Sequence, residues 1–166
     1  MHPFEVSGRR MVIAIDPGAK GAVAIFQSSE NGQEFKVEKL GPSPQERFDQ
    51  LFRYALLAEH SKCARIAVLE DVGGYIGIPQ PGSRMFRFGQ SFGQLEGCLI
   101  ALQYSIMRVK PRKWQTGLGL LSRSGEKKPE HKKRLHAKAL DLFPALKPAR
   151  DTADALLLLF YFLNNT

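Results

Sequence analysis

The chain has 166 residues, of which 43% are hydrophobic and 24% charged, a composition that excludes an intrinsically disordered protein and predicts one globular domain over residues 1–166. It has no apolar run of the roughly 20 residues that a membrane helix needs, and its two cysteines are too few for a disulfide framework. Residues 1–10 lack the apolar core of a signal peptide and are predicted to form a flexible N-terminal extension, so we expect a protein of the reducing cytosol with no membrane partner.

The predicted elements suggest an α/β fold with a mixed central sheet and helices on both faces. The run MVIAID is apolar up to its final acid, which is typical of a central strand buried on both faces, and a Pro-Gly turn predicts a hairpin after it. In chain order we expect strands at 11–16, 21–26 and 35–40, a helix at 47–61, a strand at 65–70, a functional loop at 71–90, a helix at 91–104, a strand at 106–109, a linker at 117–125, and helices at 129–143 and 150–162.

The net charge of +8 is concentrated in one segment of the chain. Residues 108–138 contain eleven of the 24 Lys and Arg residues but only two acidic ones, so this segment carries the whole positive excess. A basic stretch of this kind is typical of a surface that binds nucleic-acid phosphates. On its own, however, a charge run favours a solvated face without a ligand.

Four acidic residues stand where predicted elements begin or end. Asp16 and Glu70 close two buried strands, and the carboxyl ends of adjacent parallel strands share one edge of a sheet. Asp151 and Asp154 begin a helix that is apolar all round and must therefore be packed inside the domain. Their alternative role is to stabilise the first helical turn through the macrodipole.

Clustered carboxylates repel one another, and a divalent cation removes that repulsion. Carboxylate oxygens are natural Mg²⁺ ligands, and Mn²⁺ accepts the same donors. Two such ions can activate water and stabilise a departing oxygen in phosphodiester hydrolysis. An acidic cluster in a basic chain therefore predicts a metal-dependent enzyme acting on nucleic acid, with no small-molecule cofactor.

Several motifs resemble those of the RuvC-like Holliday junction resolvases, in the RNase H-like superfamily. They are IAIDPGAKGAVAIF, the strand end AVLE before a flexible loop, and the closing motif DTADAL. The strings FGQSFGQLEG, VKPRKWQ and the basic helix ending in LFP resemble the bacteriophage and organelle branch. In order, these motifs span residues 11–159.

The resemblance implies a homodimer that binds a four-way DNA junction and makes symmetric nicks with 5′-phosphate ends. It implies Asp16, Glu70, Asp151 and Asp154 as ligands of two Mg²⁺ ions, although some members carry His at the position of Asp151. It also implies a bacterial or phage-infected host cytoplasm, with an organelle as the alternative. Bacterial members have an aromatic residue soon after the Glu, and the nearest one here is Tyr75.

The remaining candidates are basic and aromatic residues. A lysine near the metals, for which we select Lys133 among several, is expected to stabilise charge in the transition state. Trp114 is expected to pack in the core. The predicted nucleic-acid-binding residues are Tyr75, Arg84, Arg87, Lys110, Arg112, Lys113, Lys127, Lys128, Lys132 and Arg134.

The helix at 91–104 is a candidate dimer face, because Phe92, Leu95 and Leu99 form a stripe beside the small residues Gly93 and Gly97. The alternative is that this stripe covers the sheet of its own chain. Three other functions stay open: a nuclease for RNA–DNA hybrids or precursor ribosomal RNA, an actin-like ATPase fragment, and a junction-binding protein without catalysis.

Overall fold

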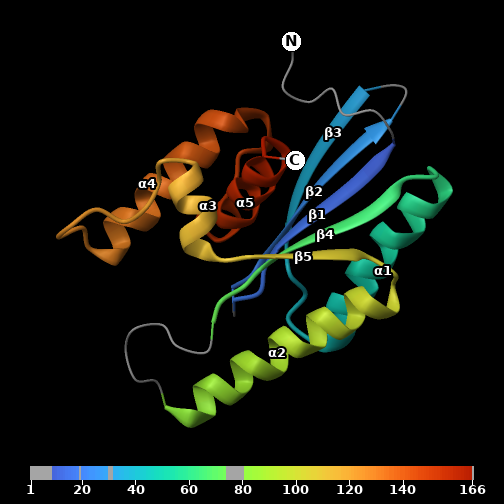
Figure 1. Cartoon of the computed structure of the whole chain (residues 1–166), viewed down its shortest axis with the longest axis horizontal. Coiled ribbons are helices and arrows are strands. Elements are labelled where there is room, and N and C mark those ends of the chain that lie inside the picture. Colours follow the sequence, from blue (N-terminus) through green and yellow to red (C-terminus); the bar gives the residue numbers. More distant parts are fainter. Residues whose placement is uncertain (1–8, 19, 30–31, 74–80, 166) are drawn as a thin grey trace.

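The computed structural model describes residues 9–18, 20–29, 32–73 and 81–165, and it contains the predicted mixed sheet (Figure 1). The strand order is β3-β2-β1-β4-β5. β1 pairs antiparallel with β2, and β2 with β3, whereas β4 is parallel to both β1 and β5. The strands are β1 (Arg10–Asp16), β2 (Ala22–Ser29), β3 (Gly32–Lys39), β4 (Ala64–Glu70) and β5 (Ser105–Val109).

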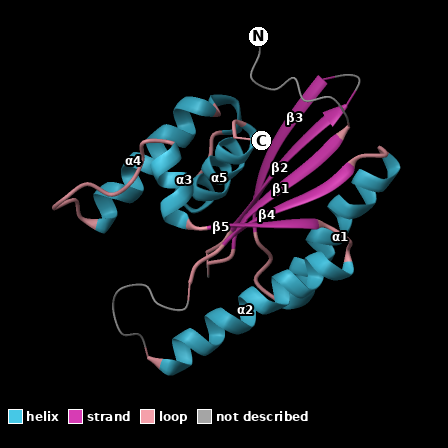
Figure 2. Cartoon of the chain, viewed as in Figure 1, coloured by secondary structure: helices cyan, strands magenta, loops and turns pink. Residues whose placement is uncertain are grey.

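Helices cover both faces of the sheet, as predicted (Figure 2). α1 and α2 lie on one face, and α3, α4 and α5 lie on the other. The helices are α1 (Pro44–His60), α2 (Gly82–Ala101), α3 (Pro111–Gly117), α4 (Lys128–Leu142) and α5 (Ala153–Leu163), with 3-10 turns η1 (Pro144–Leu146) and η2 (Arg150–Thr152). Within the described residues, no helix combines the length and the apolar character needed to cross a membrane.

β1 is apolar without interruption because each of its faces lies on a separate core. Val12 and Ala14 belong to the cluster beneath α5, and Met11, Ile13 and Ile15 belong to the cluster beneath α1 and α2. All five side chains are fully buried. Successive side chains of a strand point to opposite faces, so both cores are filled from one short run of sequence.

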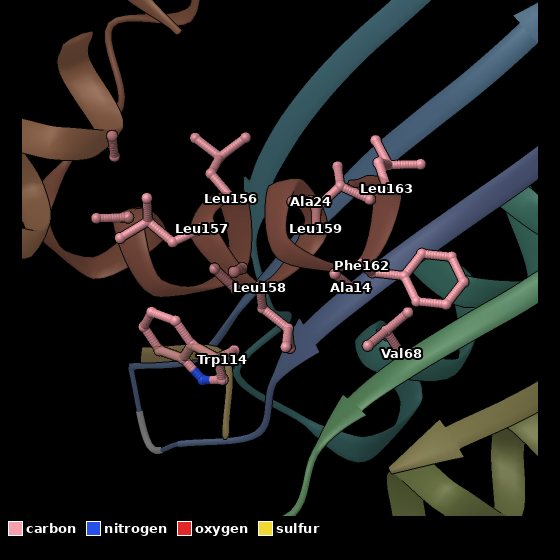
Figure 3. Close-up of a cluster of buried hydrophobic side chains, with 14 of the residues drawn as sticks. Ala14, Ala24, Val68, Trp114, Leu156, Leu157, Leu158, Leu159, Phe162 and Leu163 are labelled. Atoms are coloured by element: carbon pink, nitrogen blue, oxygen red, sulfur yellow. The ribbon is translucent and has the colours of Figure 1, made fainter. Parts of the chain in front are cut away.

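α5 is the central helix of the core that contains Val12 and Ala14, and its apolar residues are buried except for Phe160 and Tyr161, which are half-buried (Figure 3). It packs on β1 and β2 with one side and against α3 and α4 with the other. A helix with neighbours all round needs no polar face, which explains the run ALLLLFYFL. Asp154 lies in the first turn of the helix and is only 8% exposed, at the end of the sheet where β1 and β4 finish.

The turn between β1 and β2 leaves no room for a side chain at Gly21. A Cβ atom there would lie 2.3 Å from the backbone oxygen of Asp16 and 2.7 Å from that of Gly18. The Gly21 amide donates a hydrogen bond of 2.8 Å to the Gly18 oxygen, and its carbonyl accepts one of 2.9 Å from Leu40. Hydrogen bonds from both the amide and the carbonyl of Gly21 therefore hold the turn that follows Asp16.

We expect Gly21→Ala to destabilise the protein by about 1–3 kcal/mol, because the new methyl group overlaps backbone atoms that cannot move independently. Thermal unfolding followed by circular dichroism measures the effect. Gly89→Ala is the matched control, since a Cβ at this helical position meets nothing within 4 Å. A Gly21→Ala protein as stable as the Gly89→Ala protein would contradict the tight turn.

Three features differ most from those predicted. α2 begins at Gly82 and takes up part of the predicted loop; its first half is largely exposed, although the half-buried Met85, Phe88 and Phe92 at helical spacing were a signal for it. α3 was not predicted at all, although Pro111 at its first position is a helix-start signal. Arg10 belongs to β1 and is buried, not part of an extension. Residues 1–8 lie outside the described residues.

Candidate active site

The four predicted acids line one cleft of about 480 Å³. Asp16 and Glu70 come together because β1 and β4 are parallel neighbours, with Ile15 paired to Leu69 just before them. Asp151 in η2 and Asp154 in the first turn of α5 reach the same cleft. The rest of the lining is Gly18, Lys20, Lys128, Lys132 and Arg150.

Each carboxylate has a partner of its own. Asp16 Oδ1 accepts a hydrogen bond of 3.1 Å from the Gly18 amide, and Glu70 Oε1 accepts one of 2.8 Å from the indole N–H of Trp114. Asp151 Oδ2 forms an ion pair of 3.2 Å with Lys39 Nζ, and Asp154 Oδ2 accepts from Lys132 Nζ. Three different kinds of donor therefore hold the four side chains in place.

Burial and mutual repulsion make the two strand carboxyls harder to ionise. Burial, followed by repulsion from Asp16, raises the pKa of Glu70 to about 7. Burial, followed by repulsion from Asp154, also raises the pKa of Asp16. Burial lowers the pKa of Lys132, but attraction to Asp154, Asp16 and Glu70 outweighs this and the net pKa is raised. The cluster therefore favours an additional positive charge.

The donor set fits a divalent cation. All four side chains supply oxygen, the donor that Mg²⁺ and Mn²⁺ prefer. Asp154 Oδ1 is buried and has no hydrogen-bond partner among the described residues, which is a costly state that a bound cation would relieve. In the described part of the chain, no three His, Cys, Asp or Glu side chains converge on one point as a ready-made site. Ion binding would therefore require some of these carboxylates to move closer to one another.

The raised pKa of Glu70 predicts an unusual pH dependence of stability. Between 4.5 and about 7 the folded protein holds a proton that the unfolded chain has lost, so metal-free stability falls as the pH rises through this window. This difference between the unfolded and folded pKa values of Glu70 lowers the free energy of unfolding by at most roughly 3 kcal/mol. In EDTA, we expect a lower melting temperature at about pH 8 than at about pH 5.

Mg²⁺ should remove this trend, because a cation favours the ionised carboxylates. Glu70→Gln is the control and should lose most of the pH dependence in EDTA, since glutamine does not titrate. If the melting temperature of the wild-type protein in EDTA instead rises between about pH 5 and about pH 8, the surroundings of Glu70 do not disfavour its ionised form.

Lys132, not the predicted Lys133, contacts the carboxylates among the described residues. Both belong to α4, but adjacent helical positions point in directions about 100° apart, so only one can face α5. Lys132 Nζ lies against Asp154, and both lysines are largely exposed. The structure therefore places Lys132 beside the acids, and a catalytic role for either lysine stays a prediction.

The other predicted nucleic-acid contacts fall into distinct places. Lys128 and Lys132 line the cleft itself. Arg84 and Arg87 line a separate pocket with Phe88 near the start of α2. The remaining lysines and arginines are exposed around α3 and the start of α4, namely Lys110, Arg112, Lys113 and Lys127. Tyr75 lies outside the described residues.

Arg134 is held by contacts within the protein. Its guanidinium pairs with Glu126 at 2.9 Å and donates to the backbone oxygens of Leu120 and Leu121. Only 20% of its side chain is exposed. Arg134 thus holds the segment between α3 and α4 in place, and its contact with nucleic acid stays a prediction.

Four residues at the site were not predicted for it. Trp114 reaches Glu70 from α3, Lys39 reaches Asp151 from β3, and Lys20 and Arg150 line the cleft. The proximity of Lys39 follows from the pairing of β3 with β2 and has no local sequence signal. Arg150 adjoins Asp151 in the motif, which is a signal that could have been used.

No protein-family profile and no curated protein matches the chain. Solved structures do match it. RuvC from Thermus thermophilus aligns with a TM-score of 0.52 and 14% identity over 92% of this chain and 94% of that chain. The T. thermophilus RuvC in complex with a Holliday junction substrate aligns with a TM-score of 0.50 and 13% identity over the same shares.

The yeast mitochondrial Holliday junction resolvase Ydc2 is also similar, with a TM-score of 0.49 and 17% identity over 92% of this chain and 77% of that chain. At such identities a similarity in structure establishes architecture alone. The motifs, the strand order and the alignment with RuvC agree, and the chain therefore has a RuvC-like variant of the RNase H-like fold.

Proposed function

We propose that this protein is a Mg²⁺-dependent endonuclease that resolves four-way DNA junctions by paired, symmetric nicks with 5′-phosphate ends. The observation that carries this proposal is the convergence of Asp16, Glu70, Asp151 and Asp154 in one cleft of a RuvC-like fold. The similar T. thermophilus structure holds a Holliday junction substrate, which supports a junction as the DNA partner.

The carboxylates would hold the metal ions, with Asp16 and Glu70 supplied by the sheet and Asp154 and Asp151 by α5 and η2. Bound divalent ions supply an activated water and stabilise the departing oxygen. Asp154 Oδ1 is the ligand atom most clearly in need of a cation, because it is buried and unpaired among the described residues. Because the ligands come from both the sheet and α5 with η2, the site forms only when α5 and η2 pack against the sheet.

Basic side chains at the same cleft would receive the phosphodiester. Lys20, Lys128 and Arg150 line it together with Lys132. Lys132 is held at the carboxylates by Asp154, where its ammonium group would stabilise negative charge developing on the phosphate. The net charge of +8 would attract the DNA backbone over a longer range.

A homodimer would present two such sites to opposite strands of one junction. Leu95 and Leu99 are buried against the chain's own sheet, which was the alternative to a dimer contact for this apolar stripe. Gly93, Gly97 and Ile100 stay exposed on α2. We propose this exposed side of α2 as the contact between two copies.

The test is cleavage of labelled four-way junction, linear duplex and RNA–DNA hybrid, each with Mg²⁺ and with EDTA. Paired nicks in the junction alone, lost in EDTA, would support the proposal. Cleavage of the hybrid instead would move the activity to an RNase on the same fold. Junction binding without any cleavage would contradict an enzyme and favour a binding protein.

A further inference from the structure

Trp114 makes a direct hydrogen bond to a proposed metal ligand. Its indole Nε1 donates to Glu70 Oε1 over 2.8 Å. Trp114 is fully buried and Glu70 is only 7% exposed, so water does not compete for this bond. An indole can only donate, and it bears no charge, which makes it a fixed partner for one carboxylate oxygen.

The indole is held rigidly by its surroundings. β5 pairs with β4 such that Val109 lies opposite Glu70, and α3 starts two residues later at Pro111. Trp114 therefore enters the core directly beside the end of β4, in the buried layer formed with α5 (Figure 3).

A close contact also fixes α3 against α5. A Cβ atom on Gly117 would lie only 2.4 Å from the ring of Tyr161, so the backbone of α3 sits against this ring. The helix that carries the donor is thus packed against the helix that carries Asp154.

This bond holds Glu70 Oε1 in one orientation and leaves Oε2 available to a cation. Donors that orient a ligand in this way are worth about 10–100-fold in metal affinity or activity.

We propose that Trp114 is the positioning residue for Glu70, whose indole N–H orients the carboxylate for metal binding. This rests on the proposed function, in which Glu70 is a metal ligand. Trp114 touches neither substrate nor metal, so its effect is on the affinity for the ion and not on the chemical step.

Trp114→Phe keeps an aromatic ring in the core and removes the N–H group. We expect the affinity for Mn²⁺, measured by isothermal titration calorimetry on the full chain, to fall about 10–100-fold. The Mg²⁺ concentration for half-maximal cleavage should rise by a similar factor, while the rate at saturating Mg²⁺ stays within about threefold of wild type. Junction affinity in EDTA should not change.

Phe143→Leu is the matched control, because Phe143 lies in the same buried layer and has no hydrogen-bonding group. It should lower the melting temperature without altering Mn²⁺ affinity. Replacing the single tryptophan by 3-benzothienylalanine, which has sulfur in place of N–H, gives a closer match in shape should Trp114→Phe fold poorly. This protein is expected to show the same loss of affinity.

Unchanged Mn²⁺ affinity in Trp114→Phe or in the benzothienyl protein, alongside a loss in Glu70→Gln, would overturn the positioning role and leave the proposed function intact. An equal loss in Phe143→Leu would also overturn it, since packing alone would then explain the effect. Failure of the wild-type protein to bind Mn²⁺, or full binding by Glu70→Gln, would overturn the proposed function and with it this inference.

Discussion

Asp16→Asn is expected to reduce the rate of Mg²⁺-dependent junction cleavage about 1,000-fold, equivalent to roughly 4 kcal/mol of lost transition-state stabilisation. Asparagine has the size of aspartate but lacks its charge. Asp16 ends β1 at the shared edge of the sheet, where burial, followed by repulsion from Asp154, raises its pKa. Single-turnover cleavage of a labelled junction measures the loss.

The same substitution should raise the melting temperature in EDTA, because it removes one of the mutually repelling carboxylates. Junction affinity in EDTA should stay unchanged, since the basic residues are intact. Asp141→Asn is the control: Asp141 lies on α4, is exposed, and pairs with Lys138. Undiminished cleavage by Asp16→Asn with normal junction binding would show that the carboxylate cluster is not the site of chemistry.

Lys132→Met is expected to lower the cleavage rate about 100-fold, the size of effect seen when a group that stabilises transition-state charge is removed. Methionine keeps an unbranched side chain of similar length and removes the ammonium group that lies on Asp154. Cleavage rates at saturating junction and Mg²⁺ provide the measurement.

Lys133→Met is the matched control from the next position of the same helix, and we expect it to stay within about threefold of wild type because its side chain points about 100° away from that of Lys132. The pair separates a specific role from a general loss of positive charge, since both variants lose one charge. A larger effect at Lys133 than at Lys132 would restore the choice made from the sequence.

The strands and the acidic cluster could be predicted because their signals are local. A run of apolar residues ending in an acid marks the carboxyl end of a buried strand, and both β1 and β4 end with the predicted acid. α5 could be predicted to lie inside the protein, because no polar face interrupts its apolar residues.

The partners of the acids could not be predicted, because they depend on how separate elements dock. The choice between Lys132 and Lys133 requires the rotation of α4 about its axis, which a helix with many lysines does not reveal. The bond from Trp114 to Glu70 depends on α3, a helix of only seven residues between a predicted strand and a predicted linker. So short a helix does not contain enough apolar residues to show a helical period.

The bond between Trp114 and Glu70 has an optical consequence. Trp114 is the chain's single tryptophan, so all indole fluorescence of the protein originates at a side chain bonded to one of the proposed metal ligands. Indole emission responds to charge and hydrogen bonding at its ring nitrogen, and the ionisation of Glu70 or a cation beside it alters both. The protein therefore carries a label-free spectroscopic reporter of its own site, which can follow ion binding in real time without DNA and without turnover.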